Sequence, residues 1–200
     1  MRIFNSDGYE ASFCGNGLRC LVAYIQTIDK QKQKLTVETA HGVLSCSFDA
    51  DKVTVRMPLP STIALEEVEG YPLYVIDTGV PHAIFFTDDI QAVPLEEIGR
   101  KIRFHAHFAP LGVNVNCIQQ IAGNLHIRTY ERGVEAETLS CGSGAAAAAF
   151  LMAHKNSSLD PVTVIPLSKD PLQFTFAEGK MNMIGPAHFV FCGSIEPPHD

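Results

Sequence analysis

The sequence predicts an α+β fold built from two related lobes that face each other across a cleft. The first observation is a tetrapeptide present in two related copies, Cys14-Gly15-Asn16-Gly17 and Cys141-Gly142-Ser143-Gly144, each followed by an apolar helical run. The second is the alternation of apolar and polar residues in most other segments, which is typical of antiparallel strands with one solvated face. The third is the similarity between residues 2–8 and 128–133, which precede the two copies.

The N-terminal lobe is expected to span residues 1–58. A strand at 2–5, a turn and a return strand at 9–13 lead into Cys14, and the apolar run 18–28 predicts the first helix. Alternating strands are then expected at 35–39, 43–48 and 52–57. Residues 58–60, with two prolines, are interpreted as the crossover to the second lobe.

The C-terminal lobe is expected to span residues 59–185. Apolar residues at helical spacing predict a helix at 94–104, and the alanine-rich run 145–153 predicts a buried one whose small side chains let a sheet approach closely. The acidic residues 66–69 are interpreted as exposed surface. The strands expected are 73–77, 83–87, 113–121, 125–130, 135–139, 162–166, 172–176, 180–184 and 188–191.

Charge and hydropathy restrict the class of partner. The net charge is -7 with interspersed acidic and basic residues, so nucleic acid and anionic membranes are not expected as partners. No apolar run reaches the roughly 18 to 20 residues of a membrane helix, and the N-terminus lacks the apolar region of a signal peptide. A cytoplasmic protein that acts on a small molecule is expected.

Cysteine is the residue type to which the sequence assigns chemistry. There is no Cys-x-x-Cys motif and no histidine pair at zinc spacing beside a cysteine, so no metal site is predicted. Only Cys14 and Cys141 combine a helix start with flanking glycines. The thiols expected to be buried packing groups are Cys20, Cys46, Cys117 and Cys192.

Two cysteines at facing helix N-termini are suited to inverting the configuration of a carbon atom bound between them. The first amides of a helix are unpaired and carry a partial positive charge, which favours a thiolate and can hold a substrate carboxylate. One sulfur would remove a proton from the carbon next to that carboxylate, and the other would return a proton to the opposite face. Backbone N–H donors would stabilise the carbanion, so no cofactor is expected.

The two cysteine blocks, 2–20 and 130–144, closely resemble the signature blocks of diaminopimelate epimerases, and loops 79–82 and 112–116 resemble further parts of that family. The resemblance implies that each lobe is a mostly antiparallel sheet rolled around a central helix, with the active site between the lobes. It also implies cofactor-independent conversion of LL- to meso-diaminopimelate, which serves lysine and peptidoglycan precursor synthesis. A homodimer is the assembly considered.

The resemblance also assigns roles to individual residues. Cys14 and Cys141 match the acid/base pair, and His82 and Glu131 match positions that support catalysis. The residues matched to substrate binding are Asn5, Gly15, Asn16, Asn114, Glu131, Arg132, Gly142 and Ser143.

Two departures from the family pattern carry expectations of their own. The chain begins directly at the first cysteine block, so the first lobe is expected to be incomplete and to be completed by a C-terminal strand around residues 186–195. Val80 stands where the family has an asparagine, which removes a hydrogen bond to the end of the substrate far from the reacting carbon. Relaxed selectivity toward shorter acidic amino acids is therefore expected.

Other functions remain open at this stage. Proline and hydroxyproline racemases are related, but they carry a histidine where this chain has Asn16. A non-catalytic relative that keeps only the fold is a second alternative. A redox switch is a third, because two facing thiols can form a disulfide when their Cα atoms lie within about 7 Å.

Overall fold

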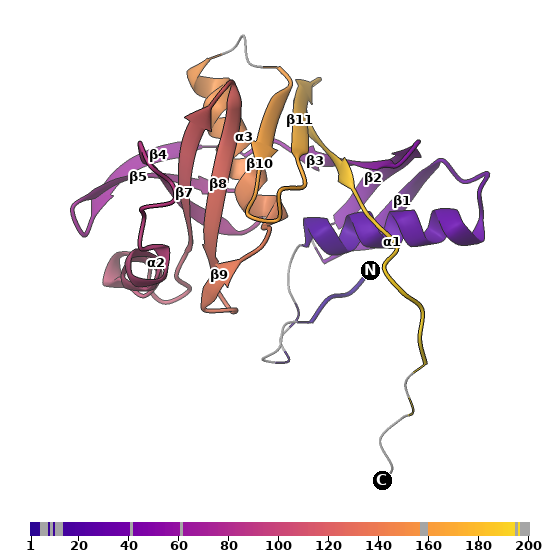
Figure 1. The fold of residues 1–200 in the computed structure, drawn as a ribbon, viewed down its shortest axis with the longest axis horizontal. Helices are drawn as coiled ribbons and strands as arrows, with labels where there is room; N and C mark the ends of the chain where they lie inside the picture. Colours follow the sequence, from indigo (N-terminus) through magenta and orange to yellow (C-terminus); the bar gives the residue numbers. More distant parts are fainter. Residues whose placement is uncertain are drawn as a thin grey trace.

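The computed structural model describes residues 1–4, 8, 10, 14–40, 42–60, 62–156, 160–194 and 196. Twelve strands among these residues form one hydrogen-bonded sheet (Figure 1), in the order β1-β2-β3-β12-β11-β10-β8-β7-β6-β5-β4, with β9 paired to β8. The elements are, in chain order, α1 (Gly15–Ile28), β1 (Lys34–Thr39), β2 (Gly42–Asp49), β3 (Lys52–Pro58), β4 (Ile63–Val68), β5 (Tyr71–Asp77), β6 (Pro81–Phe86), α2 (Leu95–Arg103), the 3₁₀ helix η1 (Ala106–Phe108), β7 (Asn114–Ile121), β8 (Asn124–Glu131), β9 (Ala136–Thr138), α3 (Gly142–Lys155), β10 (Val162–Ile165), β11 (Leu172–Ala177) and β12 (Lys180–Pro186).

The last strand, β12, joins the two halves of the sheet. It pairs antiparallel with β3 on one side, where Met183 lies opposite Val55, and with β11 on the other, where Met183 lies opposite Phe174. All three side chains are fully buried. Strands from the beginning of the chain are therefore held to the rest of the sheet by its final strand.

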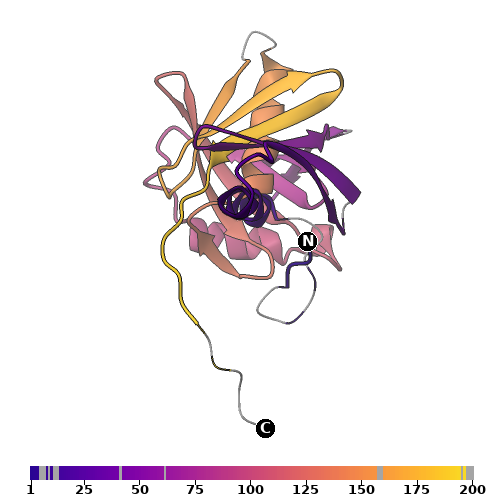
Figure 2. The same cartoon turned by 90° about the vertical axis from the view of Figure 1, so that its right-hand side faces the viewer.

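The sheet curves around two helices (Figures 1 and 2). α1 packs on β2 and β3, whereas α3 contacts β5, β6, β7, β8, β10 and β11. The alanines at 145–149 are completely buried, and one apolar cluster includes residues of both helices, among them Leu18, Val22 and Leu151. The predicted α+β fold, mostly antiparallel and wrapped around helices, is confirmed.

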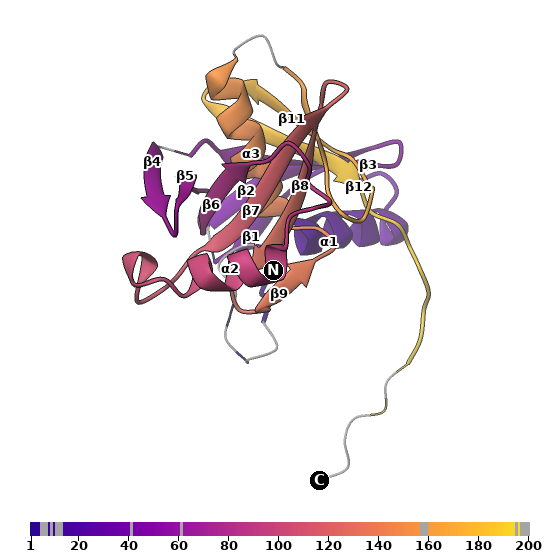
Figure 3. The same ribbon diagram turned by 60° about the vertical axis from the view of Figure 1, so that its left-hand side comes forward.

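α2 lies on the outer face of the sheet (Figure 3). Its apolar residues Leu95, Ile98 and Ile102 pack on β7 and β8, in a second cluster that includes Val115 and Tyr130. Gly99 permits this close approach, because a Cβ there would lie 2.6 Å from the Tyr130 Cβ. None of the described helices is long and apolar enough to cross a membrane.

Several segments differ from the sequence prediction. Residues 63–68, part of which was expected as exposed acidic surface, form β4, which pairs with β5. Residues 187–194 form no strand, although 188–191 were expected as one and the region around 186–195 was expected to complete the first lobe. β12 ends at Pro186 because its partner β3 begins opposite it at Lys52, so the chain leaves the ladder there. The following segment runs past α1 and away from the sheet (Figure 2).

Candidate active site

The two cysteines occupy equivalent positions at the starts of α1 and α3. Each is the N-cap residue of its helix, with extended backbone angles. The Sγ of Cys14 accepts a hydrogen bond from the Gly17 amide at 3.3 Å, and Cys141 Sγ lies 3.4 Å from the Ser143 hydroxyl. Both thiols therefore stand where the unpaired amides of a helix begin, as the sequence predicts.

The starts of α1 and α3 are in contact with each other. A Cβ added to Gly142 would lie 3.4 Å from the Gly15 Cα, so the two helix starts approach backbone to backbone. The Asn16 side-chain amide donates to the carbonyl of Ser140 at 2.9 Å. The structure thus brings Cys14, Gly15 and Asn16 together with Gly142 and Ser143, although they are 124 positions or more apart.

Arg19 fixes the orientation of Asn16. Its guanidinium donates to Asn16 Oδ1 at 3.0 Å and to the Pro186 carbonyl at 3.3 Å, and the side chain is buried. The Asn16 side chain is therefore held at both ends, by Arg19 and by the Ser140 carbonyl. Arg19 is a site residue that sequence reasoning missed.

Burial controls the charge of Cys141. It raises the pKa of this thiol to about 12, and the neighbouring Glu131 carboxylate acts in the same direction. The Ser143 hydroxyl and the Gly144 amide oppose the shift without cancelling it. The expectation that the helix start favours a thiolate is therefore wrong for Cys141 in the free protein, because the loss of hydration on burial outweighs the effect of the helix terminus on the pKa.

His82 is fully buried at the start of β6, where a loop was expected. Burial lowers its pKa to about 3, and the Arg132 charge also lowers it, so the ring is neutral at physiological pH. Its Nδ1 lies 3.2 Å from Asn116 Nδ2, whose amide oxygen accepts from Thr129 Oγ1 at 2.9 Å. The Nε2 atom has no hydrogen-bond partner among the described residues.

Asn114 holds the turn that carries Glu131 and Arg132. Its Oδ1 accepts from the Arg132 amide at 2.9 Å, and its Nδ2 donates to the Pro81 carbonyl at 3.2 Å. The Glu131 carboxylate accepts from Thr138 Oγ1. These contacts link the polar candidates to the loop before His82.

Most candidate residues therefore gather around the two helix starts, whereas Asn5 lies outside the described residues. Sequence reasoning missed Asn116 and Thr78, whose hydroxyl donates to the Ser143 carbonyl at 3.4 Å. Asn114 and Asn116 alternate with apolar residues in the first half of β7, and both are buried. That alternation was the available signal, since buried amides require fixed partners.

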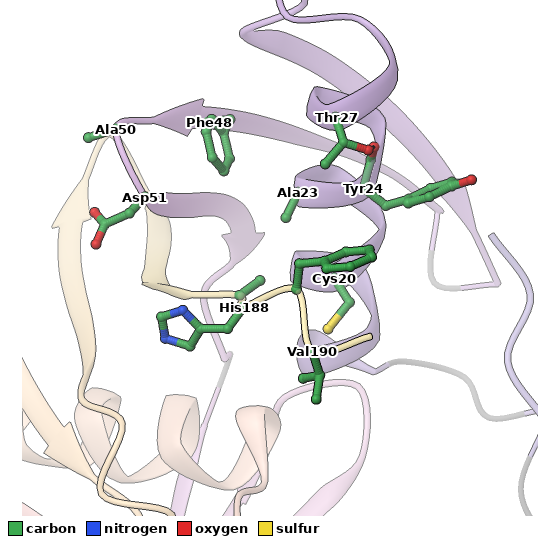
Figure 4. A pocket seen from close by; sticks show the side chains of 11 residues that line it. Cys20, Ala23, Tyr24, Thr27, Phe48, Ala50, Asp51, His188 and Val190 are labelled. Carbon is green, nitrogen blue, oxygen red and sulfur yellow. The ribbon is translucent and has the colours of Figure 1, made fainter. Parts of the chain in front are cut away.

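A separate hollow of about 430 Å³ lies between α1, the β2–β3 turn and the segment after β12 (Figure 4). Side chains of α1, of the β2–β3 turn and of the segment after β12 line it, including Cys20, Tyr24, Asp51 and His188. None of the candidate site residues lines this hollow. Cys20 and Cys192 are exposed rather than buried as expected, whereas Cys46 and Cys117 are buried.

Comparison with known proteins gives the same family as the two cysteine blocks. The sequence profile described as diaminopimelate epimerase matches residues 1–63 and 74–190. The chain is 38% identical to the diaminopimelate epimerase of Methanocella arvoryzae, with 98% of this chain and 76% of that protein covered. It is also 38% identical to that of Chlamydia muridarum, with 96% and 75% covered.

Solved structures share the fold at low sequence identity. A probable proline racemase from Agrobacterium radiobacter has a TM-score of 0.69 at 16% identity, with 92% of this chain and 68% of that one covered. A putative phenazine biosynthesis PhzC/PhzF protein from Clostridium difficile has a TM-score of 0.67 at 15% identity, with 98% and 78% covered. With the paired cysteine corners and the sequence matches taken together, the chain belongs to the diaminopimelate epimerase family and is an isomerase.

Proposed function

We propose that this protein interconverts LL- and meso-diaminopimelate by moving protons between the substrate and the thiols of Cys14 and Cys141. The observation that carries the proposal is the contact between the two helix starts, each with a cysteine as its N-cap. A carboxylate bound to the first amides of both helices would place its α-carbon between the two sulfurs. Stereoinversion at that carbon requires an acid and a base on opposite faces.

The environments of the two sulfurs support different starting roles. Cys141 is held as a neutral thiol by burial and is the proton donor. Cys14 is more exposed, and its Sγ accepts the Gly17 N–H, so it is the base. The Cα–H bond breaks toward Cys14, the electron pair stays on the substrate as a carbanion stabilised by backbone amides, and the Cys141 proton is added from the other face. In the reverse direction the two sulfurs exchange roles.

The remaining candidates hold the rest of the substrate. Gly15, Asn16, Gly142 and Ser143 offer backbone or hydroxyl donors to the α-carboxylate. Asn5, Asn114, Glu131 and Arg132 bind the polar groups beyond it, with Arg132 suited to a carboxylate. Neutral His82 packs against Gly144 at the start of α3 and supports that end of the site.

Hydrogen exchange at the substrate tests the mechanism. In D₂O with reductant, wild-type protein should introduce deuterium at the α-carbon of diaminopimelate, and Cys14→Ser and Cys141→Ser should abolish it. Persistent exchange in both variants would exclude the two thiols as the acid and base. Exchange into proline but not diaminopimelate would instead favour a proline-type racemase.

Selectivity at the end of the substrate far from the reacting carbon is a second part of the proposal. Val80 has no side-chain hydrogen-bonding group, so one contact worth about 0.5–1.5 kcal/mol is absent. Glutamate and aspartate should therefore exchange at a measurable rate. Strict exclusion of both would overturn this part, and Val80→Asn should reduce their exchange relative to that of diaminopimelate.

A homodimer is the assembly we propose. β1 stands at one end of the described sheet, where β2 is the strand that it pairs with among the described residues. Apolar residues Phe189, Val190 and Phe191 are also exposed, at 70%, 85% and 81%. Analytical ultracentrifugation should give twice the mass of 21.8 kDa, and a single species of monomer mass at micromolar concentration would reject the dimer.

A further inference from the structure

The turn that carries Glu131 and Arg132 is closed by the side chain of Glu135. The Glu135 amide donates to the Glu131 carbonyl at 2.8 Å, and its Oε1 accepts from the Gly133 amide at 2.9 Å. Gly133 and Glu135 both have positive φ, 89° and 59°. A non-glycine residue keeps this conformation only when its surroundings hold it there, so the shape of the turn depends on Glu135.

Arg103, the last residue of α2, holds the carboxylate of Glu135. Its Nε and Nη2 atoms donate to Glu135 Oε1 at 3.2 and 2.9 Å. The side chains of Arg103 and Glu135 are 14% and 32% exposed, so water screens this pair much less than an ion pair on the open surface. Charge-assisted bonds in such surroundings fix geometry as well as adding stability.

The Arg103 guanidinium and the Arg132 guanidinium both contact the backbone carbonyl of Leu111. Arg103 Nη1 donates to the Leu111 carbonyl at 3.4 Å, and Arg132 Nη1 lies 3.5 Å from the same oxygen. Gly112 next to it has a φ of +70°, and a Cβ there would lie 2.7 Å from the Arg103 carbonyl oxygen. Arg103 therefore fixes both the turn that carries Arg132 and the Leu111 carbonyl that the Arg132 guanidinium contacts.

We propose that Arg103 and Glu135 are positioning residues that fix the Arg132 guanidinium and so determine how tightly the site holds the carboxylate at the far end of the substrate. The inference rests on the proposed role of Arg132. No contact with Cys14 or Cys141 is found for either residue in the described part of the chain. The pair therefore acts on substrate binding and leaves the proton transfers unchanged.

Steady-state kinetics with LL-diaminopimelate test this assignment through KM and kcat measured separately. Glu135→Gln keeps the shape of the side chain and an acceptor for the Gly133 amide but loses the negative charge. Arg103→Lys keeps the positive charge but loses the paired Nε and Nη2 donors. Both should raise KM about tenfold, the order expected when one charged hydrogen bond is weakened. Both should leave kcat within about twofold of wild type, because the reacting carbon is not displaced.

The chain provides a matched control in a second shielded ion pair. Arg128 Nε and Glu137 Oε1 are 2.6 Å apart, with side chains 15% and 14% exposed, and Arg128 also donates to the carbonyls of Ile90 and Val93. Glu137→Gln removes the same kind of interaction away from Leu111. It should lower the unfolding midpoint without changing KM.

Arg132→Lys tests the role of Arg132 separately from the positioning roles of Arg103 and Glu135. If Arg132→Lys raises KM but Glu135→Gln and Arg103→Lys behave like Glu137→Gln, the positioning role is overturned while the role of Arg132 stands. An unchanged KM in Arg132→Lys overturns both, and deuterium exchange at the α-carbon then still tests the two-cysteine mechanism independently. If the single variants do not fold, the neutral pair Arg103→Gln with Glu135→Gln takes their place, and a wild-type KM in that protein rejects the proposal.

Discussion

His82 shows how a titratable side chain is confined to one charge state by its surroundings. It is completely buried, its pKa is lowered to about 3 by burial, and its Nδ1 is paired with the Asn116 amide. A charged imidazolium in this place would lack water and would lie near the Arg132 cation. The ring is thus neutral throughout the physiological range.

This confinement predicts a loss of stability in acid. The folded-state pKa lies below the unfolded value of 6.5, so the unfolded chain binds the proton first as the pH falls. The contribution of neutral His82 to the free energy of unfolding is complete above about pH 7 and declines between about pH 6.5 and 3. Urea unfolding should show a fall of about 2 kcal/mol from pH 7 to 5 that is absent in His82→Gln. An equal fall in both proteins would show that other groups cause it.

Gly144 is a second residue whose identity follows from one contact. A Cβ at this position would lie 2.5 Å from Asn116 Oδ1 and 3.4 Å from His82 Nδ1, inside the buried polar network. Gly144→Ala should therefore destabilise the protein by about 1–3 kcal/mol and slow α-carbon exchange. Gly193→Ala, whose Cβ would meet nothing closer than 3.8 Å, is the control and should unfold like wild type.

At this scale the sequence predicts which residues lie at the two helix starts better than it predicts their electrostatics. Cys14 and Cys141 follow from flanking glycines and apolar runs, which are local signals. The raised pKa of Cys141 depends on how deeply the second corner is covered, and a sequence does not contain that depth. Arg19 was missed for the same reason, because its partners Asn16 and Pro186 meet only in the folded chain.

Among the elements, α3 depends most strongly on side-chain size. Its alanines at 145–149 have no exposed surface, and the surrounding strands lie close to them. Ala147→Leu should cost about 1–3 kcal/mol in the free energy of unfolding, because the added methyl groups have no space. Ala153→Leu, at a partly buried position of the same helix, should cost less than Ala147→Leu. Comparable losses in the two variants would contradict this account.

Helices and most strands were predictable because their patterns are local. α2 begins at Leu95 with apolar residues at helical spacing, and β2 and β3 alternate along their length. β4 was missed because charged residues occupy part of an edge strand, where one side is open to water. Residues 188–191 carry the alternation of a strand without forming one, since β3 offers no further partner beyond Lys52.

For the molecule as a whole, the continuous sheet and the apolar cluster shared by α1 and α3 predict a single cooperative unfolding transition. Met183 is buried on β12, between β3 and β11. Met183→Ala should lower the stability by about 2–5 kcal/mol and shift far-ultraviolet and tyrosine near-ultraviolet circular dichroism transitions together. Separate transitions would instead support lobes at 1–58 and 59–185 that unfold independently.

The place of β12 in the ladder also has a consequence for how the chain matures on the ribosome. α1 and its three strands are synthesised well before β12, the strand that joins them to the rest of the sheet. At a synthesis rate of about 5–20 residues per second, several seconds pass between the synthesis of Cys14 and that of β12. Nascent chains from which β12 has not emerged should therefore be alkylated at Cys14 faster than the folded protein, and the rate should fall once β12 has emerged.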